Sequence, residues 1–541
     1  MDAVFSIPYL IGLTFEYCLQ ADLARCARVS RSLSEPALDA LYRVVRDPVV
    51  LLRFLASLEY ESDTWNFKHK INATDWQRFQ LYARRVRVLT YDARTNGVIS
   101  PGVWNDIALT RPPSVICPGL HTLEWRVGHA SQLSQYSLLF IHEGLMSLEI
   151  GGWNEPTRLF RGISYRAPNL RKLSIHLLDH ARLADDSADE PELISLIKGA
   201  SRLEQVELPL PLFTTQILNA LSTSPSLARL LRSKRTRTSI LNTPLQKSNF
   251  PGGSFQSLQH MDLVIDLHML CSPSTSRWSL PTLASLDCIA RINGSPALVG
   301  KSIKAIAQTF PALKALKMNI IDGRDVFQEP SDVDALRPFM ALTQMRSFTF
   351  YAPNGLMMES VNEREITDLA KAWPYLEDFE IGCTDCAPDD EHAYFSPLTV
   401  AAIFPFAEHC PLLRSLHLHV RPDIPPSRPP LDSTQFKRTF STLTLGCSTL
   451  QVSACAQFAS IISGLVDPGV SVGCCDDLWR RGPPEIRGPW KEFKRLLPIF
   501  VAARHEERMR AASLAQNAVS QDLEALRAVI LRNGLSLPAV I

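Results

Sequence analysis

The stretch "PNLRKLSIH", Pro168 to His176, contains the pattern that predicts the fold of this chain. It has the form L-x-x-Φ-x-Φ, where Φ is an apolar residue. The alternation of apolar and polar residues at its end is typical of a half-buried β-strand. A proline two residues before the phrase ends a preceding helix and favours extended backbone. The stretch therefore predicts a turn followed by a strand.

The same phrase occurs ten times along the chain. Its copies begin at Leu120, Leu145, Leu170, Leu203, Leu258, Leu283, Leu313, Met345, Leu376 and Leu413. A further copy at Leu227 is incomplete, because Arg232 occupies its last apolar position. Helical patterns precede several copies, as in residues 191–200 and 297–310. The repeating unit is therefore predicted to be a helix, a turn and a strand.

The spacing of the copies indicates the architecture. The steps from 120 to 145, 145 to 170 and 258 to 283 are 25 residues, and most others are 30 to 37. This resembles a leucine-rich repeat of roughly 20–29 residues with loop insertions. We expect the α/β class and an irregular leucine-rich-repeat solenoid, a horseshoe with parallel strands on its concave side. The alternative is a set of ordinary α/β units whose strands begin alike.

An acidic file runs across the predicted strands. The apolar residues of each phrase point inward, so the residues between them point to the concave face. The middle outward position is acidic in six of the ten copies: Glu124, Glu149, Glu207, Asp262, Asp287 and Glu380. These are the candidate substrate-binding residues, since an acidic stripe attracts a basic protein. The alternative is an ordinary solvated strand face.

Composition excludes several functional classes. The chain has 541 residues, 46% of them hydrophobic, and a net charge of +1, which gives no global field for nucleic acid or an anionic membrane. We expect neither a signal peptide nor a membrane span. The twelve cysteines lack the spacing of a disulfide framework, which favours a reducing compartment, cytoplasmic or nuclear.

The sequence predicts no catalytic, cofactor-binding or metal residues. It contains none of the motifs G-x-x-x-x-G-K-[ST], G-x-G-x-x-G, H-E-x-x-H and G-x-S-x-G. The C-x-x-C pair Cys383 and Cys386 lacks the second pair of a zinc site, so a loop thiol pair is expected. We therefore expect a non-catalytic binding protein, with an enzyme of hidden site as a distant alternative.

The first 45 residues follow another pattern. Pro8 suits the first turn of a helix, Asp22 can cap a second helix, and a third is expected after Pro36. Apolar residues recur at helical spacing in each segment. A unit of about 40 residues is too small to bury both faces of its helices. Its apolar surface must therefore meet a neighbouring domain or another protein.

This segment resembles an F-box. The resemblance lies in Ile7-Pro8, Ile11, Phe15, Asp22-Leu23, Val29-Ser30-Arg31, Leu33 and Leu41-Tyr42. The sequence departs from the family pattern at Gly12, Ser30, Leu33 and Tyr42. Four further segments, 75–89, 340–350, 369–381 and 496–508, are similar to fungal-type F-box proteins with leucine-rich repeats. The resemblance thus extends over most of the chain.

The resemblance implies a substrate-recognition subunit of an SCF-type cullin–RING ubiquitin ligase. The box would dock on the Skp adaptor, and through it on the cullin, while the solenoid holds a protein substrate. The adaptor-binding residues it implies are Ile7, Pro8, Ile11, Phe15, Leu19, Leu23, Val29, Leu33 and Leu41. The alternative is a repeat scaffold or binding protein whose front helices only cap the solenoid.

Four segments are expected along the chain: the F-box-like module (1–46), a helical linker and cap (47–95), the solenoid (96–480) and a C-terminal helical cap or tail (481–541). Residues 490–534 are helical in pattern, with a kink expected at Pro498. We expect this helix to close the far end of the solenoid. A partner-binding or self-pairing helix is the alternative.

Overall fold

A computed structural model describes residues 8–128, 130–152, 156–176, 189–233, 254–270, 280–292, 297–322, 336–352, 361–383, 398–421, 435–445, 450–473 and 484–532. Ile7 and Cys386 lie outside these ranges. The chain divides into two compact units, Met1–Asp287 and Cys288–Ile541. The boundary falls within the predicted solenoid. No helix of the described residues is long and apolar enough to cross a membrane.

The first unit begins with three helices, α2 (Pro8–Glu16), α3 (Gln20–Val29) and α4 (Arg31–Arg43), here called the N-terminal module. The third helix begins earlier than expected, because the Ser30 hydroxyl accepts a hydrogen bond from the Leu33 amide and caps it. Pro36 therefore lies inside α4. Asp22, expected as a cap, lies in the first turn of α3.

Helix α4 leads without a linker into the sheet of the first unit. β1 (Val44–Val45) follows it directly and pairs in parallel with β4 (Val88–Asp92). The segment expected to be a helical linker contains strands as well as helices. These are α5 (Pro48–Leu52), the hairpin β2 (Leu58–Glu61) and β3 (Thr64–Phe67), α6 (Ala73–Ala83), and β4. α7 (Ala93–Asn96), β5 (Val98–Ile99) and α8 (Pro101–Thr110) follow.

The repeated phrases form strands, as predicted. In the first unit these are β6 (Thr122–Arg126), β7 (Ser147–Gly151), β8 (Lys172–His176), β9 (Gln205–Leu208), β10 (Arg229–Arg232) and β11 (His260–Asp266). They succeed one another in parallel, and equivalent positions pair: Leu123 with Leu148, and Leu148 with Leu173. The incomplete copy at Leu227 also forms a strand, β10.

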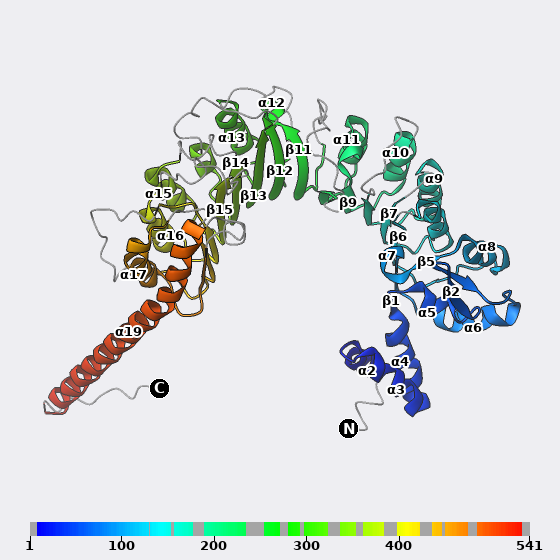
Figure 1. Cartoon of the computed structure of the whole chain (residues 1–541), viewed down its shortest axis with the longest axis horizontal. Coiled ribbons are helices and arrows are strands. Elements are labelled where there is room, and N and C mark those ends of the chain that lie inside the picture. Colours follow the sequence, from blue (N-terminus) through cyan, green and yellow to red (C-terminus); the bar gives the residue numbers. More distant parts are fainter. Residues whose placement is uncertain are drawn as a thin grey trace. The chain divides into compact units, whose positions relative to one another are not determined.

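Helices cover the face of the sheet toward which the inward residues of the strands point (Figure 1). They are η1 (Ser131–Leu139), α9 (Pro156–Arg166), α10 (Asp189–Gly199), η2 (Leu210–Leu212), α11 (Thr215–Ser222) and α12 (Leu267–Leu270). The inward residues of each strand, such as Leu173 and Ile175, are buried against them. Each repeat therefore buries its core between one strand and one helix, as leucine-rich repeats do.

The second unit continues the pattern from β12 (Ser285–Ile292), within which the boundary lies. Its further strands are β13 (Ala315–Asp322), β14 (Ser347–Ala352), β15 (Asp378–Cys383), β16 (Ser415–His417), β17 (Thr442–Thr444) and β18 (Ser471–Gly473). Its helices include α13 (Ala297–Thr309), η5 (Arg337–Ala341), α15 (Glu363–Ala372), η6 (Val400–Ile403), α16 (Phe404–His409), η7 (Val452–Ala454) and α17 (Cys455–Leu465). The described residues thus form an α/β fold with a large, 15-stranded parallel sheet in chain order.

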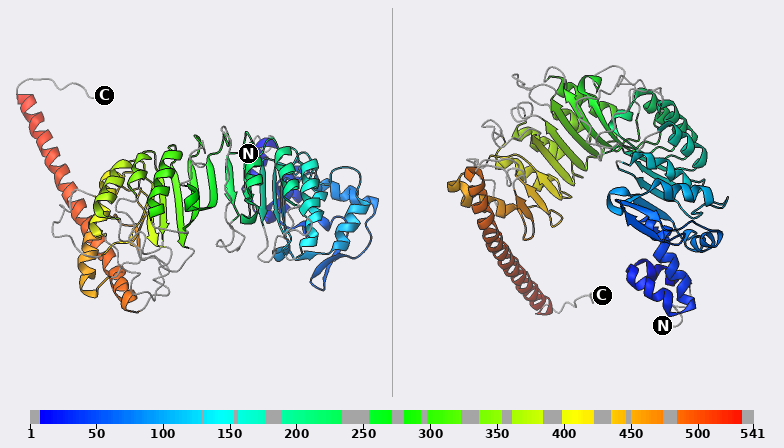
Figure 2. Two further views of the ribbon diagram at one scale, coloured as in Figure 1. Left: turned by 90° about the horizontal axis from the view of Figure 1, so that it is seen from above. Right: turned by 45° about the vertical axis from the view of Figure 1, so that its right-hand side comes forward.

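The last helix of the second unit, α19 (Pro484–Arg532), begins earlier than expected and continues through Pro498. Its first part packs on α17, where Phe493 and Trp490 are buried and the ring centroids of Phe458 and Phe493 are 5.4 Å apart. The helix then continues beyond α17 (Figure 2). Its first part therefore covers α17, as a cap would, and its second part does not.

Candidate functional site

The N-terminal module has its own small core. Ile11, Phe15, Leu23 and Ala37 are buried in it, and Leu33 and Leu41, among others, pack against it partly buried. Five of the residues implied as adaptor contacts therefore hold the module together. Pro8 is the first residue of α2.

The other two implied contacts lie on the module surface. Leu19 is 74% exposed and Val29 is 72% exposed, at the two ends of α3. Tyr17, 90% exposed, and Leu13 are further exposed apolar side chains that the sequence did not single out. Their exposure could have been predicted from the sequence, because a unit of about 40 residues cannot bury every large apolar side chain of three short helices. These four residues are called the module apolar surface.

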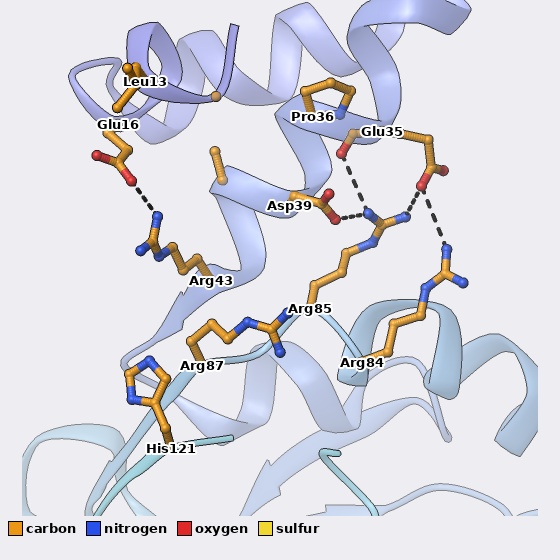
Figure 3. Close-up of a pocket in the computed structure, with 12 residues that line it drawn as sticks. Leu13, Glu16, Glu35, Pro36, Asp39, Arg43, Arg84, Arg85, Arg87 and His121 are labelled. Atoms are coloured by element: carbon orange, nitrogen blue, oxygen red, sulfur yellow. Dashed lines mark hydrogen bonds and ion pairs between the residues drawn. The ribbon is translucent and has the colours of Figure 1, made fainter. Parts of the chain in front are cut away.

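A groove of about 990 Å³ lies where the module meets the start of the sheet (Figure 3). It is lined by Gly12, Leu13, Glu16, Glu35, Pro36, Asp39, Ala40, Arg43, Arg84, Arg85, Arg87 and His121. Most of these side chains are charged, and they come from α2, α4, the end of α6 and the turn before β6. The sequence signal was the basic run of residues 84–87, which was not singled out.

Arg85 joins the two sides of the groove. Its side chain is only 5% exposed, and its Nη2 donates to Oε2 of Glu35 at 2.7 Å while Nη1 donates to Asp39. Its Nε donates to the Leu81 carbonyl oxygen at 3.0 Å. The hydrogen bond and charge of Arg85 hold the pKa of Glu35 below its usual value. A single buried guanidinium thus links the end of α6 to two carboxylates of α4 (Figure 3).

The opposite end of the groove is more positive. Partial burial, together with the charges of Arg87 and Arg43, lowers the pKa of His121. The guanidinium of Arg87 lies over Gly119, where a Cβ atom would be 1.5 Å from its Nη1. Glycine at position 119 is therefore what lets Arg87 lie there.

The outward side chains of β4 and β6 to β9, here called the strand face, form a hydrogen-bonded network around Arg126. Its Nε donates to Oε1 of Glu149 at 2.6 Å, and its Nη2 to Oε2 of Glu124 at 2.8 Å. Nε2 of His176 lies 3.2 Å from the same Glu149 oxygen. Because β7 has Gly151 in register with Arg126 and His176, no side chain stands between them. Side chains from β6 and β8 therefore both reach one carboxylate of β7.

Glu149 is the most perturbed carboxyl group of this network. Burial alone would raise its pKa, but hydrogen bonds from His176 and Arg126 outweigh it and lower the pKa to about 2. His176 also shares a 2.6 Å hydrogen bond between its Nδ1 and the Ser233 hydroxyl. The carboxylate is therefore held charged and fixed by the chain itself.

The remaining residues of the predicted acidic file differ in accessibility. Glu207 accepts a hydrogen bond from the Ser174 hydroxyl at 3.3 Å and is partly exposed. Asp262 is only 1% exposed and lies 3.4 Å from Nη2 of Arg232, so it does not present its charge to a partner. Asp287 lies on β12 and is partly exposed. The acidic residues of the file thus differ in exposure, and several of them are paired with a cation or a hydrogen-bond donor of the same chain.

The described part of the second unit contains a similar arrangement on β15 and β16. Oε1 of Glu380 lies 2.9 Å from Nδ1 of His417 and accepts a hydrogen bond from the Tyr351 hydroxyl. The hydrogen bond from His417 is the largest cause that lowers the pKa of Glu380, against the opposing effect of burial. The His417 and His419 rings stack with centroids 5.8 Å apart. Among the described residues, no cluster of three or more metal-ligating side chains exists.

Comparison with known proteins gives no family for the chain. No family model matches it, and no curated protein matches it. Among solved structures it is similar to the Rad7 and Elc1 complex in yeast, with 11% identity over 63% of this chain and 85% of that one and a TM-score of 0.33. It is also similar to the leucine-rich repeat-containing protein LegL7 from Legionella pneumophila, with 12% identity, coverages of 56% and 94%, and a TM-score of 0.30. A third is the TLR13–ssRNA13 complex, with 10% identity, coverages of 73% and 63%, and a TM-score of 0.28.

Proposed function

We propose that this chain is the substrate receptor of an SCF-type cullin–RING ubiquitin ligase, with no catalytic step of its own. The N-terminal module docks on a Skp-type adaptor, and the strand face binds a protein substrate in the cytoplasm or nucleus. The receptor then acts by raising the local concentration of the substrate beside a ubiquitin-loaded enzyme held elsewhere in the complex.

The observation that carries the proposal is the module apolar surface. A unit with its own core leaves Leu19, Val29 and Tyr17 in solvent, although their burial would be favourable. Exposed apolar side chains gathered on one small module are typical of a protein-binding surface. The F-box resemblance of the module, which includes Val29, supports a Skp-type adaptor as the partner.

The attachment of the module supports a role in positioning. α4 continues into β1, and Arg85 ties α4 to the end of α6. The rings of Tyr42, Phe54 and Tyr82 pack beside this junction, with centroids of Phe54 and Tyr82 3.8 Å apart. A partner bound to the module would therefore be held in a defined orientation to the first strands.

Purified full-length chain and a purified Skp-type adaptor test the proposal by calorimetry. Leu19→Asp and Val29→Asp change exposed residues, so the module should stay folded while affinity falls at least about tenfold. Leu81→Asp is the matched control, because Leu81 is an exposed apolar residue of α6, outside the module. Absence of wild-type binding, or equal binding by all three variants, would reject adaptor docking.

The same attachment favours a second candidate, a repeat scaffold whose module only caps the sheet. β1 begins the strand order and follows α4 directly, so the module is attached at that end of the sheet. A cap without adaptor affinity would give no calorimetric signal, yet removing residues 1–43 would lower the stability of the chain. A receptor module would give a calorimetric signal as well as that loss of stability.

The strand face is the proposed substrate surface, for a protein with a basic patch. Glu207 is the most informative position, because its side chain is partly exposed and accepts a 3.3 Å hydrogen bond from the uncharged Ser174 hydroxyl, while Nδ1 of His176 is 3.8 Å away. Glu207→Lys should weaken binding of a lysine-rich model peptide and reduce the salt dependence of that binding. Glu204→Lys, on the turn before β9 where Glu204 pairs with Arg171, is the control. Unchanged binding by the Glu207 variant would remove this part of the proposal.

A further inference from the structure

The last part of α19 leaves the body of the second unit at a defined residue. Nη2 of Arg508 donates to the Gly464 carbonyl oxygen at 2.6 Å, and Nη1 lies 3.9 Å from Oδ1 of Asp467. From Met509 to Ala525 every side chain is exposed, while the helix continues to Arg532. Most of the stability of helices in proteins comes from the packing of an apolar face against a neighbour. The apolar side chains of this segment therefore stay in water unless a partner covers them.

Apolar residues form a seam along this free segment. Met509, Ala512, Gln516, Val519 and Leu523 follow one another at alternating steps of three and four, and the sequence continues the spacing with Leu526 and Ile530. Met509, Val519 and Leu523 are 60%, 60% and 51% exposed. Alternating steps of three and four place residues at positions a and d of a heptad, the seam of a coiled coil.

We propose that this seam, from Met509 to Ile530, pairs in parallel with the same seam of a second copy of the chain. The polar member of the seam, Gln516, distinguishes a second copy from an unrelated helix. A buried amide costs free energy unless its donor and acceptor are both satisfied. In a self-pair the two Gln516 amides meet at the same level, and each can donate to the other and accept from it.

The flanking charges also suit a second copy. In a parallel pair, a residue at position g faces the residue five positions further along the partner helix, at position e. This brings Asp522 opposite Arg527, and Ala515 opposite Ser520. No like charges face each other at these positions. Opposite charges at e and g favour the parallel, in-register pair.

Sedimentation of the full-length chain over a wide range of concentration tests the pairing. The wild type should change from one copy to two as concentration rises. Leu523→Glu should raise the dissociation constant at least about tenfold, because the change enters the seam twice. Leu514→Glu is the matched control, since Leu514 is an exposed apolar residue outside the seam. Because both positions are exposed in the single chain, neither change should unfold it.

Two further variants fix the geometry. Asp522→Arg should weaken pairing, and adding Arg527→Asp to it should restore pairing. Gln516→Leu makes the seam wholly apolar and should tighten association, with loss of a single oligomeric state. One-copy mass at every concentration, for the wild type and Gln516→Leu alike, would overturn the proposal and leave an unrelated helix as the occupant. Adaptor affinity should be the same in Leu523→Glu, so this inference and the proposed function fail independently.

Discussion

The strand face and the N-terminal module differ in what they leave unsatisfied. On the strand face, the carboxylates of Glu124 and Glu149 meet Arg126 and His176 of the same chain. On the module, Leu19 and Val29 lie in water with nothing of the described chain covering them. The carboxylates of the strand face are therefore largely paired within the fold, whereas the apolar side chains of the module can still be buried by a partner. Under the proposed function, adaptor binding at the module is therefore expected to be the tighter interaction, and substrate binding at the strand face to depend more on charge complementarity.

The largest expected effect separates the inner from the outer apolar residues of the module. Leu23→Asp places a carboxylate in the small core formed with Ile11 and Phe15, which should cost about 4 kcal/mol and unfold the module. Hydrogen exchange should show lost protection in α2 to α4, with β6 to β9 still protected. Leu19→Asp, at an exposed position of the same segment, should keep the protection. Equal protection in both variants would show that the module has no core of its own.

The strand face should respond to loss of its central cation. Arg126→Met removes the partner of two partly buried carboxylates and should lower the free energy of unfolding by about 3 kcal/mol. Arg171→Met is the control, because Arg171 and Glu204 form a half-exposed pair at 3.2 Å, which should contribute less than about 1 kcal/mol. Urea unfolding at neutral pH measures both. Similar losses would mean that the network is no more than a surface pairing.

The strands were predictable from the sequence because their signal is local. The phrase has a leucine, two spacer residues and two alternating apolar residues. It predicts β6 to β16, including β10, where Arg232 takes the last apolar position. The same rule missed β4 and β17, which begin their phrases at Val86 and Phe440. These residues are buried in the position that leucine occupies elsewhere. The core accepts any large apolar side chain there, whereas the pattern required leucine or methionine.

The site was less predictable, because it depends on contacts between repeats. The acidic file occupies the middle outward position of each strand. Its partners, Arg126 and His176, occupy the next outward position, two residues further along neighbouring strands. Only the register shows that both reach Glu149 across Gly151. In the module, periodicity identified apolar residues without showing which face inward. The burial of Phe15 and the exposure of Leu19 depend on how three short helices pack.

The smallest expected effect is on acid stability, and it tests whether the strand face holds its charge as the contacts indicate. The pKa of Glu149 is about 2 in the fold, against 4.5 for an unperturbed glutamate. Since the folded-state pKa is depressed, the carboxylate stabilises the fold above pH 4.5, and this contribution is lost as the pH falls towards 2. Between about pH 7 and pH 3 it should amount to about 2 kcal/mol. Glu149→Gln has no such charge to neutralise, so its stability should fall less over that range, while Glu204→Gln should follow the wild type. Urea unfolding at the two pH values measures the difference, and parallel losses in all three proteins would place the acid sensitivity outside the strand face.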